Sequence, residues 1–292
     1  MMKWKIFVPS AGLCLLCMSL RSSNHLLIGY GSPSEITAQS TGAADVRRLL
    51  SVAVMAIKYN FESLGKWCIS VINYHCDTST FISDCSDGDL ERLAHIAYHD
   101  NIASSESPSP LLRTLQTKWL KLLKDNEQLS VNLALDVGEK YKWDTFRGIL
   151  YHREALRMCS TPPQGNRGVI SPLQALNLTH DRRVLAGFAS LSLFWDRFAS
   201  RKVPFVQLCD NQEYHRTHCN YYYNLMWAEI ILSATAAQNV VNVTGRIMHM
   251  HKAVPSVMSY KSISARCQQQ ILDGLLNAYD ELVENLPYHF LM

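Results

Sequence analysis

Residues 271–287 read ILDGLLNAYDELVENLP, and this stretch decides the fold class. Its apolar residues recur at intervals of three and four: Ile271, Leu275, Leu276, Tyr279, Leu282, Val283 and Leu286. This spacing follows the 3.6-residue period of an amphipathic helix with one buried face. It predicts a helix over 257–286 that ends at Pro287, because proline interrupts the helical hydrogen bonds.

The same period recurs along most of the chain. Over 46–72 it predicts one long helix, or two in series with Gly65 as the weak point. Ser86–Asp89 fit a capping box that opens a helix. Ser109–Pro110 fit the N-cap and first turn of the next one. Further helices are expected over 143–158, 180–200 and 212–238.

Runs of alternating β-branched residues are scarce, and strands do not alternate with helices. The sequence therefore predicts an all-α bundle of about six to eight helices with disulfides and a long Pro/Gly loop. The loop is STPPQGNRGVISP at 160–172, where the helical pattern is broken most strongly. We expect one helical domain over 43–292, with 160–172 as the place where it could divide.

The first residues have the organisation of a secretory signal. Lys3 and Lys5 precede an apolar segment at 6–20, which matches the charged and apolar regions of a signal peptide. A membrane anchor would need roughly 18–20 apolar residues, and this shorter run also contains Pro9. We expect a signal peptide at 1–22, a flexible leader at 23–42 and no membrane span after cleavage.

Charge argues against a nucleic-acid partner. The chain has 28 Lys+Arg and 25 Asp+Glu, and cleavage after residue 22 would remove Lys3, Lys5 and Arg21, which leaves 25 of each sign. Nucleic-acid binding needs a clustered basic face, and the short pairs Arg182–Arg183 and Arg201–Lys202 do not make one. The expected partner is instead a protein outside the producing cell. No cofactor is expected, and the oligomeric state is not predicted.

Cysteines and sequons agree with export. Cysteines of an exported protein are disulfide candidates first, and the odd number beyond the signal leaves one thiol over. These candidates are Cys68, Cys76, Cys85, Cys159, Cys209, Cys219 and Cys267. Asn177 and Asn242 begin N-x-T sequons and are candidate glycosylation sites.

One segment, CDNQEYHRTHCNYYYNLMW at 209–227, concentrates possible metal ligands. On a helix, His215 and Cys219 would share a face at i and i+4, with His218 beside them and Cys209 in the preceding turn. Two sulfurs and two nitrogens suit zinc. The spacing matches no standard zinc module, however, and oxidation would compete for the thiols. A Cys209–Cys219 disulfide, or bridges from each to distant cysteines, is therefore the favoured interpretation, and the aromatic run at 221–227 is expected in the core.

Motifs of nucleophilic catalysis and glycine-rich phosphate loops do not appear in a convincing setting. Residues 46–67, VRRLLSVAVMAIKYNFESLGKW, resemble the first long helix of exported chorismate mutases, and the resemblance extends in outline over 46–143. It implies that Lys66, in the Lys-Trp end of that helix, matches the catalytic lysine of the family, with Arg47 or Arg48 as a further cation. Where the family has its first-helix arginine, this chain has Ala56 or Ile57.

Three functions follow as hypotheses. The first is a secreted helical interaction protein, such as a host-directed effector of a pathogen or symbiont. The second is a divergent secreted chorismate mutase that uses Lys66. The third is a helical protein that binds a small ligand in a pocket lined by the aromatic residues of 221–227.

Overall fold

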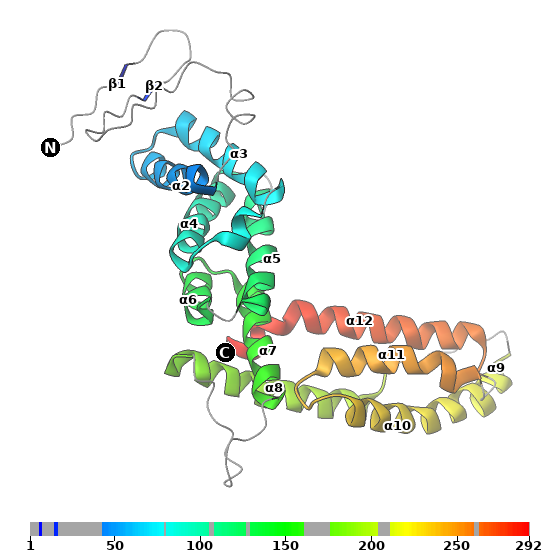
Figure 1. The fold of residues 1–292 in the computed structure, drawn as a ribbon. Coiled ribbons are helices and arrows are strands. Elements are labelled where there is room, and N and C mark those ends of the chain that lie inside the picture. The colour runs from blue at the N-terminus through cyan, green and yellow to red at the C-terminus, as the bar shows by residue number, and fades with distance from the viewer. Residues whose placement is uncertain are drawn as a thin grey trace. The chain divides into compact units, whose positions relative to one another are not determined.

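The computed structural model describes residues 6–7, 15–16, 43–78, 80–104, 108–126, 129–160, 176–203, 211–259 and 263–291. Helices make up almost all of these ranges (Figure 1), so the all-α prediction is confirmed. Two short strands, β1 (Ile6–Phe7) and β2 (Leu15–Leu16), pair antiparallel within the segment predicted as a signal peptide. The leader predicted at 23–42 lies outside the described residues.

The chain forms two compact units, residues 1–133 (unit 1) and 134–292 (unit 2). The boundary falls inside α6 (Val131–Lys140), a ten-residue helix that the sequence analysis did not predict. Of the loop at 160–172, the predicted place for a division, only residue 160 is described. Within the described ranges, none of the helices combines the length and hydrophobicity that a membrane span requires.

Unit 1 is a cluster of helices that share one apolar core. Its elements are α2 (Ala43–Lys58), α3 (Glu62–Thr78), the 3-10 turn η1 (Phe81–Asp84), α4 (Asp87–Ala103) and α5 (Pro110–Asp125). α2 packs against α3 and α4, and α5 packs against the same two helices. The largest fully buried side chains of this core are Leu50, Ile72, Ile82, Leu90, Leu93, Ile96, Leu111, Leu115 and Trp119.

The chain turns between α2 and α3 at Asn60. Its φ of 54° lies in the left-handed region, which asparagine visits more readily than most residues. The N–H of Phe61 donates to the Ala56 carbonyl (2.8 Å) and that of Asn60 to the Ile57 carbonyl (3.2 Å), the two bonds of a Schellman helix end. The alternative of two helices is therefore the observed one. The predicted weak point was wrong, because Gly65 is buried inside α3.

Two predicted helix starts are confirmed. Ser86 Oγ accepts a hydrogen bond from the Asp89 N–H (3.3 Å), and the Asp89 carboxylate accepts one from the Ser86 N–H (3.2 Å), which completes a capping box. Ser109 Oγ accepts from the Leu112 N–H (3.3 Å), with Pro110 at the first helical position. Each such cap is worth about 1 kcal/mol, so local sequence fixes where α4 and α5 begin.

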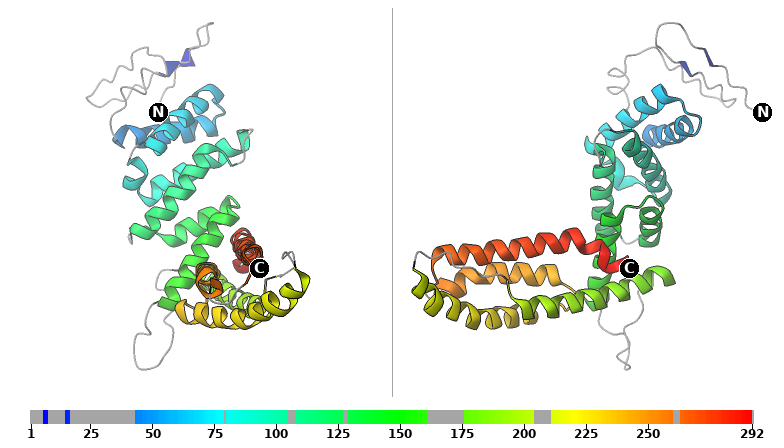
Figure 2. Two further views of the ribbon diagram at one scale, coloured as in Figure 1. Left: turned by 90° about the vertical axis from the view of Figure 1, so that its right-hand side faces the viewer. Right: turned by 180° about the vertical axis from the view of Figure 1, so that it is seen from behind.

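Unit 2 is organised around α12. Its elements are α7 (Asp144–Ser160), α8 (Leu178–Arg201), α9 (Gln212–Tyr214), the single π-helical turn η2 (His215–Cys219), α10 (Asn220–Ala237), α11 (Val243–Ser259) and α12 (Ala265–Phe290). α12 packs against α7, α8 and α11, and α10 packs against α11. Figures 1 and 2 show α8, α10, α11 and α12 lying side by side within this unit.

The predicted helix over 257–286 is replaced by parts of two helices. α11 ends at Ser259, and α12 begins at Ala265 after Ser264, whose Oγ accepts from the Cys267 N–H (3.4 Å). The predicted end was also wrong, because α12 continues through Pro287 to Phe290. With these changes and the added α6, the described part of the chain holds ten α-helices longer than a single turn, more than the six to eight expected.

Two glycines allow other helices to approach α12 closely. A Cβ at Gly148 of α7 would lie 2.8 Å from the Cα of Pro287, and one at Gly187 of α8 would lie 1.9 Å from the Phe290 ring. Phe290 has no exposed surface and its ring stacks on Tyr151 at 5.8 Å. The last turns of α12 are therefore clamped between α7 and α8.

Candidate functional site

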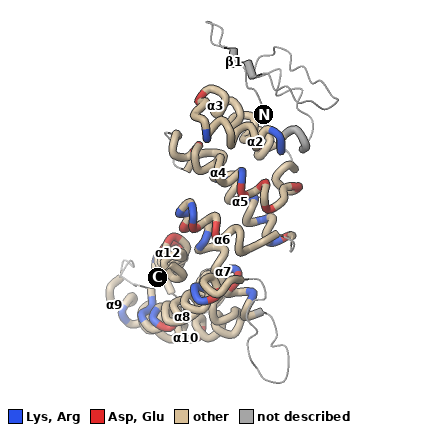
Figure 3. The backbone as a smooth tube through the Cα atoms, turned by 90° about the vertical axis from the view of Figure 1, so that its left-hand side faces the viewer, with Lys and Arg blue, Asp and Glu red and all other residues tan. Residues whose placement is uncertain are grey.

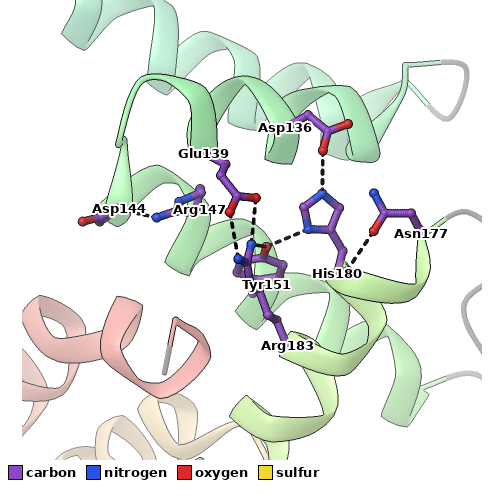
Figure 4. A network of polar contacts seen from close by, with 8 residues as sticks. All are labelled: Asp136, Glu139, Asp144, Arg147, Tyr151, Asn177, His180 and Arg183. Atoms are coloured by element: carbon purple, nitrogen blue, oxygen red, sulfur yellow. Dashed lines mark hydrogen bonds and ion pairs between the residues drawn. The ribbon is translucent and has the colours of Figure 1, made fainter.

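A network of polar side chains joins α6, α7 and α8 within unit 2 (Figure 4). His180, near the start of α8, has only 1% of its surface exposed. Its Nε2 lies 3.0 Å from Asp136 Oδ1, and its Nδ1 lies 2.8 Å from the Tyr151 hydroxyl oxygen. Because a carboxylate only accepts, the tautomer that satisfies both contacts donates from Nε2 to Asp136 and accepts at Nδ1 from the Tyr151 O–H.

Arg183 closes this network from the same helix. Its guanidinium donates two hydrogen bonds to the Glu139 carboxylate, at 2.9 and 2.8 Å, and a third to the Tyr151 hydroxyl oxygen at 3.1 Å. The hydrogen bond from Arg183 lowers the pKa of Glu139, so this carboxylate is ionised. Burial raises the pKa of Tyr151, so the phenol keeps its proton.

The network connects three helices, and its two central members are enclosed, whereas the side chains of Asp136 and Glu139 are 59% and 44% exposed. Tyr151 has no exposed surface, and His180 has almost none, so neither group can reach a reacting atom in solution. Asn177 Oδ1 accepts from the His180 N–H (3.0 Å) and caps α8. Asp144 accepts from Arg147 (2.5 Å) at the start of α7. We therefore interpret these side chains as a polar cross-link of α6, α7 and α8.

A second cluster, the thiol–imidazole cluster of His215, Cys219 and Cys267, lies where η2 meets α12. The potential ligand atoms all lie within 4.8 Å of one another, and Cys267 Sγ is 3.4 Å from His215 Nδ1. The two cysteines have no exposed surface, whereas His215 is half-buried. The π-helical turn runs from His215 to Cys219, and such turns are frequent at functional sites.

Only part of the predicted metal-ligand set is found here. The i, i+4 pair of His215 and Cys219 is brought together as predicted. His218 is exposed, stacks on Tyr214 with ring centroids 4.6 Å apart, and shares a hydrogen bond with the Thr217 hydroxyl. Cys209 lies outside the described residues, and the Cys209–Cys219 disulfide therefore stays a prediction.

The predicted disulfides do not appear among the cysteines that the structure describes. These residues are Cys68, Cys76, Cys85, Cys159, Cys219 and Cys267, and no disulfide joins any two of them. Cys68, Cys76 and Cys85 fill helix interfaces of unit 1, where burial raises the pKa of each thiol to about 12. A buried cysteine acts as a small apolar side chain, so packing accounts for these three.

The cations implied by the chorismate mutase resemblance have separate partners. Lys66 has a side chain 71% exposed and pairs with Glu62 at 2.7 Å. Arg47 donates to Asp89 (3.2 Å) and to the Asp84 carbonyl (2.6 Å), and it holds α2 against the start of α4. Arg48 is exposed. Stabilising a charged transition state needs preorganised donors in a site that excludes water, and Lys66 in this position is open to solvent.

Both predicted glycosylation sites are helix caps. Asn177 is exposed at the N-cap of α8. Asn242 is half-buried before α11: its Oδ1 accepts from the Gly245 N–H (3.0 Å), and its Nδ2 donates to Gln238 (2.7 Å). Asparagine is a preferred N-cap residue, so capping explains both asparagines whether or not they carry glycans.

The aromatic run at 221–227 divides between the core and the surface. Tyr223 and Trp227 are each 3% exposed and lie against each other. Their polar atoms donate to the carbonyls of Val203 (2.6 Å) and Ala199 (2.9 Å). These rings are therefore core residues, as predicted, and do not line an open pocket. Tyr221, in contrast, is 57% exposed.

Tyr221 begins an exposed apolar stripe along α10, here called the α10 seam. Its members lie at spacings of four, three, four and three residues: Tyr221, Leu225, Ala228, Leu232 and Thr235. Leu225 is 48% exposed and Leu232 is 70% exposed. Alternating steps of three and four are the seam spacing of helices that pack on another helix. Sequence analysis missed this stripe because α10 is apolar on most sides, and only the structure separates its buried face from its exposed face.

Comparison with known proteins adds no relative: no protein-family model, no curated protein and no solved structure matches this chain. Function must therefore be argued from the residues themselves. Figure 3 shows Lys and Arg interspersed with Asp and Glu along the described helices.

Proposed function

We propose that this protein is exported and acts by binding a partner protein through the α10 seam, in the manner of a host-directed effector. The signal-like segment at 1–22 supports export, and the α10 seam supports binding. The seam is the observation that carries the proposal. Large apolar side chains at helix-pairing spacing on a solvent-exposed face are typical of a surface that another helix covers.

The chemistry of the seam defines the partner. Leucines at alternating positions, with the small Ala228 between them, form holes that fit the apolar side chains of an amphipathic helix. Glu229 is the only charged residue of α10 and is exposed beside the seam. In a two-fold antiparallel pairing of two copies centred on Ala228, Glu229 would face the same carboxylate. A partner helix with Lys or Arg next to its apolar stripe would attract this carboxylate, whereas a second copy would repel it.

Photocrosslinking on the full chain tests the proposal. A photoreactive residue is placed at Leu225 or Leu232 in the exported protein, and at Asp273 of α12 as the exposed control. We expect one discrete partner to be crosslinked from both seam positions and not from the control. The crosslink should disappear when the other seam leucine is changed to Glu, and the purified partner should bind at least about 30-fold more weakly, since a central contact is worth about 2 kcal/mol.

Two results would contradict this proposal. Crosslinks that join two copies of this chain would make the seam a self-association surface. A pattern that is equal at the seam and at Asp273 would show that the seam has no specific occupant. Export is tested separately by sequencing the N-terminus of the protein recovered from the medium, which should begin near residue 23.

The alternatives from the sequence are distinguished by simple assays. A chorismate mutase consumes chorismate, and Lys66→Ala should abolish that activity if the resemblance reflects function. A ligand-binding protein should release a small molecule on denaturation. Neither result is expected, because Lys66 is paired at the surface and Tyr223 and Trp227 are buried in the core.

A further inference from the structure

The thiol–imidazole cluster has the composition and spacing of a metal site. Two cysteines and a histidine are a common ligand set for zinc, with Zn–S near 2.3 Å and Zn–N near 2.0–2.1 Å. A tetrahedral zinc with these bond lengths separates a sulfur from a nitrogen by roughly 3.5 Å. The observed distance from Cys267 Sγ to His215 Nδ1 is 3.4 Å.

The backbone fixes the three ligands from two directions. His215 and Cys219 are the first and last residues of η2, and Cys267 lies in the first turn of α12, where Ser264 caps the helix. α9, which precedes η2, begins after Asn211, whose Oδ1 accepts from the Tyr214 N–H (3.0 Å). Both ligand-bearing segments therefore have capped starts, so the ligands are largely positioned before any ion binds.

The charge of the ligands favours a divalent ion over a monovalent one. The two cysteines have no exposed surface, and a buried site with net charge is costly. Two thiolates and a neutral imidazole offset the charge of a 2+ ion, whereas a 1+ ion would leave one negative charge in the interior. On binding, each cysteine loses its proton to solvent, so two protons are released for each ion.

We infer that His215, Cys219 and Cys267 supply three ligands of a zinc site, and among the described residues no fourth His, Cys, Asp or Glu joins them. Three protein ligands with one open position characterise zinc sites that can bind an exogenous group. His215 is the least buried of the three ligands. This site is independent of the α10 seam and stands whether or not a partner protein binds there.

Zinc titration of the full chain tests the inference. The protein is purified under reducing conditions, stripped of metal and titrated with Zn²⁺ against a chromophoric chelator. Co²⁺ serves as a spectroscopic probe. We expect one Zn²⁺ per chain and, with Co²⁺, a thiolate-to-cobalt charge-transfer band with tetrahedral d–d bands.

Matched variants assign the ligands. Each of His215→Gln, Cys219→Ser and Cys267→Ser should weaken zinc binding by about 100-fold or more, because even outer partners of zinc ligands are worth roughly 10- to 100-fold. His218→Gln removes the neighbouring exposed imidazole and should bind like the unmodified chain. Should the buried serine variants fail to fold, the half-buried His215→Gln and the cobalt spectrum of the unmodified chain still decide the case.

Three results would overturn the zinc site. The first is a lack of stoichiometric binding to the reduced chain. The second is an affinity that His218→Gln lowers as much as His215→Gln does. The third is a Cys219–Cys267 disulfide in the native exported protein, seen in a non-reducing peptide map without any metal.

Discussion

α12 and α10 both pack against α11 in unit 2, yet their solvent-exposed faces differ in composition. The exposed face of α12 carries all of its Arg, Asp and Glu residues: Arg266, Asp273, Asp280, Glu281 and Glu284. α10 has the single charge of Glu229, and its other exposed positions include Leu225, Ala228 and Leu232 together with the uncharged Asn220, Asn224 and Ser233. A helix that is apolar all round is normally buried all round. The difference indicates that the exposed face of α12 is suited to solvent, whereas the exposed apolar stripe of α10 is suited to contact with another protein.

The largest expected effect is the difference in stability lost when a buried leucine of α12 and an exposed leucine of α10 are each changed to alanine. Leu275 of α12 has no exposed surface, whereas Leu232 of α10 is 70% exposed. Leu275→Ala should lower the free energy of unfolding by about 2–5 kcal/mol. Leu232→Ala should change it by no more than about 0.5 kcal/mol. Denaturant unfolding of both variants makes the comparison, and an equal loss would mean that the seam is already packed within this chain.

Removing one hydroxyl from the polar cross-link should have the next largest effect. In Tyr151→Phe, the ring still stacks on Phe290, but His180 loses its donor and Arg183 loses one acceptor. A buried polar group left without its partner costs about 1–3 kcal/mol. Tyr221→Phe on the α10 seam is the matched control, because its exposed hydroxyl can bond to water. If both variants are equally stable, the network adds nothing to the packing of α6, α7 and α8.

The features of the fold that could be predicted from the sequence are those that depend on residues close together in the chain. The caps at Ser86 and Ser109 and the period of α12 were predictable because they are local. α6 was missed since it is short and contains Gly138, although Ser130, whose Oγ accepts from the Leu133 N–H at 3.2 Å, was a usable start signal. The end of α12 was misplaced for another reason: Pro287 stays inside the helix and packs closely against Gly148 of α7, a contact that no local pattern shows.

The candidate sites were less predictable because their members are distant in sequence. His215 and Cys219 were paired correctly from their spacing, but no spacing rule links either of them to Cys267. The α10 seam could not be predicted for a different reason. Periodicity locates an apolar stripe only when the rest of the helix is polar, and the buried face of α10 is also apolar.

Acid should weaken the contacts that two half-buried histidines make in the interior of unit 2. His289 of α12 shares a hydrogen bond with Ser190 (2.8 Å), and His152 of α7 lies 3.3 Å from the Val241 carbonyl. Burial lowers the pKa of both histidines below 6.5. The unfolded chain therefore binds more protons than the folded one as pH falls through about 6.5. Stability is full above that pH and declines below it, toward the lowered folded pKa values.

Thermal unfolding measured at about pH 7.5 and about pH 5.5 checks this prediction. The melting temperature should fall in acid, and the fall should be smaller in a His152→Gln, His289→Gln double variant. Glu139 does not interfere, because its pKa is lowered from 4.5 and its contribution is lost only in stronger acid. A fall of the same size in the double variant would assign the acid sensitivity to other groups.

The smallest effect is expected from the one leucine that breaks the polar face of α12. Leu276 is 37% exposed and lies among Asp273, Asn277 and Asp280. A single apolar side chain on a polar face is ordinary and defines no interface. Leu276→Gln should therefore change the free energy of unfolding by less than about 0.5 kcal/mol and leave partner binding unchanged, whereas Leu232→Gln should leave stability unchanged and weaken binding. If Leu276→Gln also weakened binding, the partner would contact α12 as well as α10, and the two helices would not differ in their exposure to solvent in the complex.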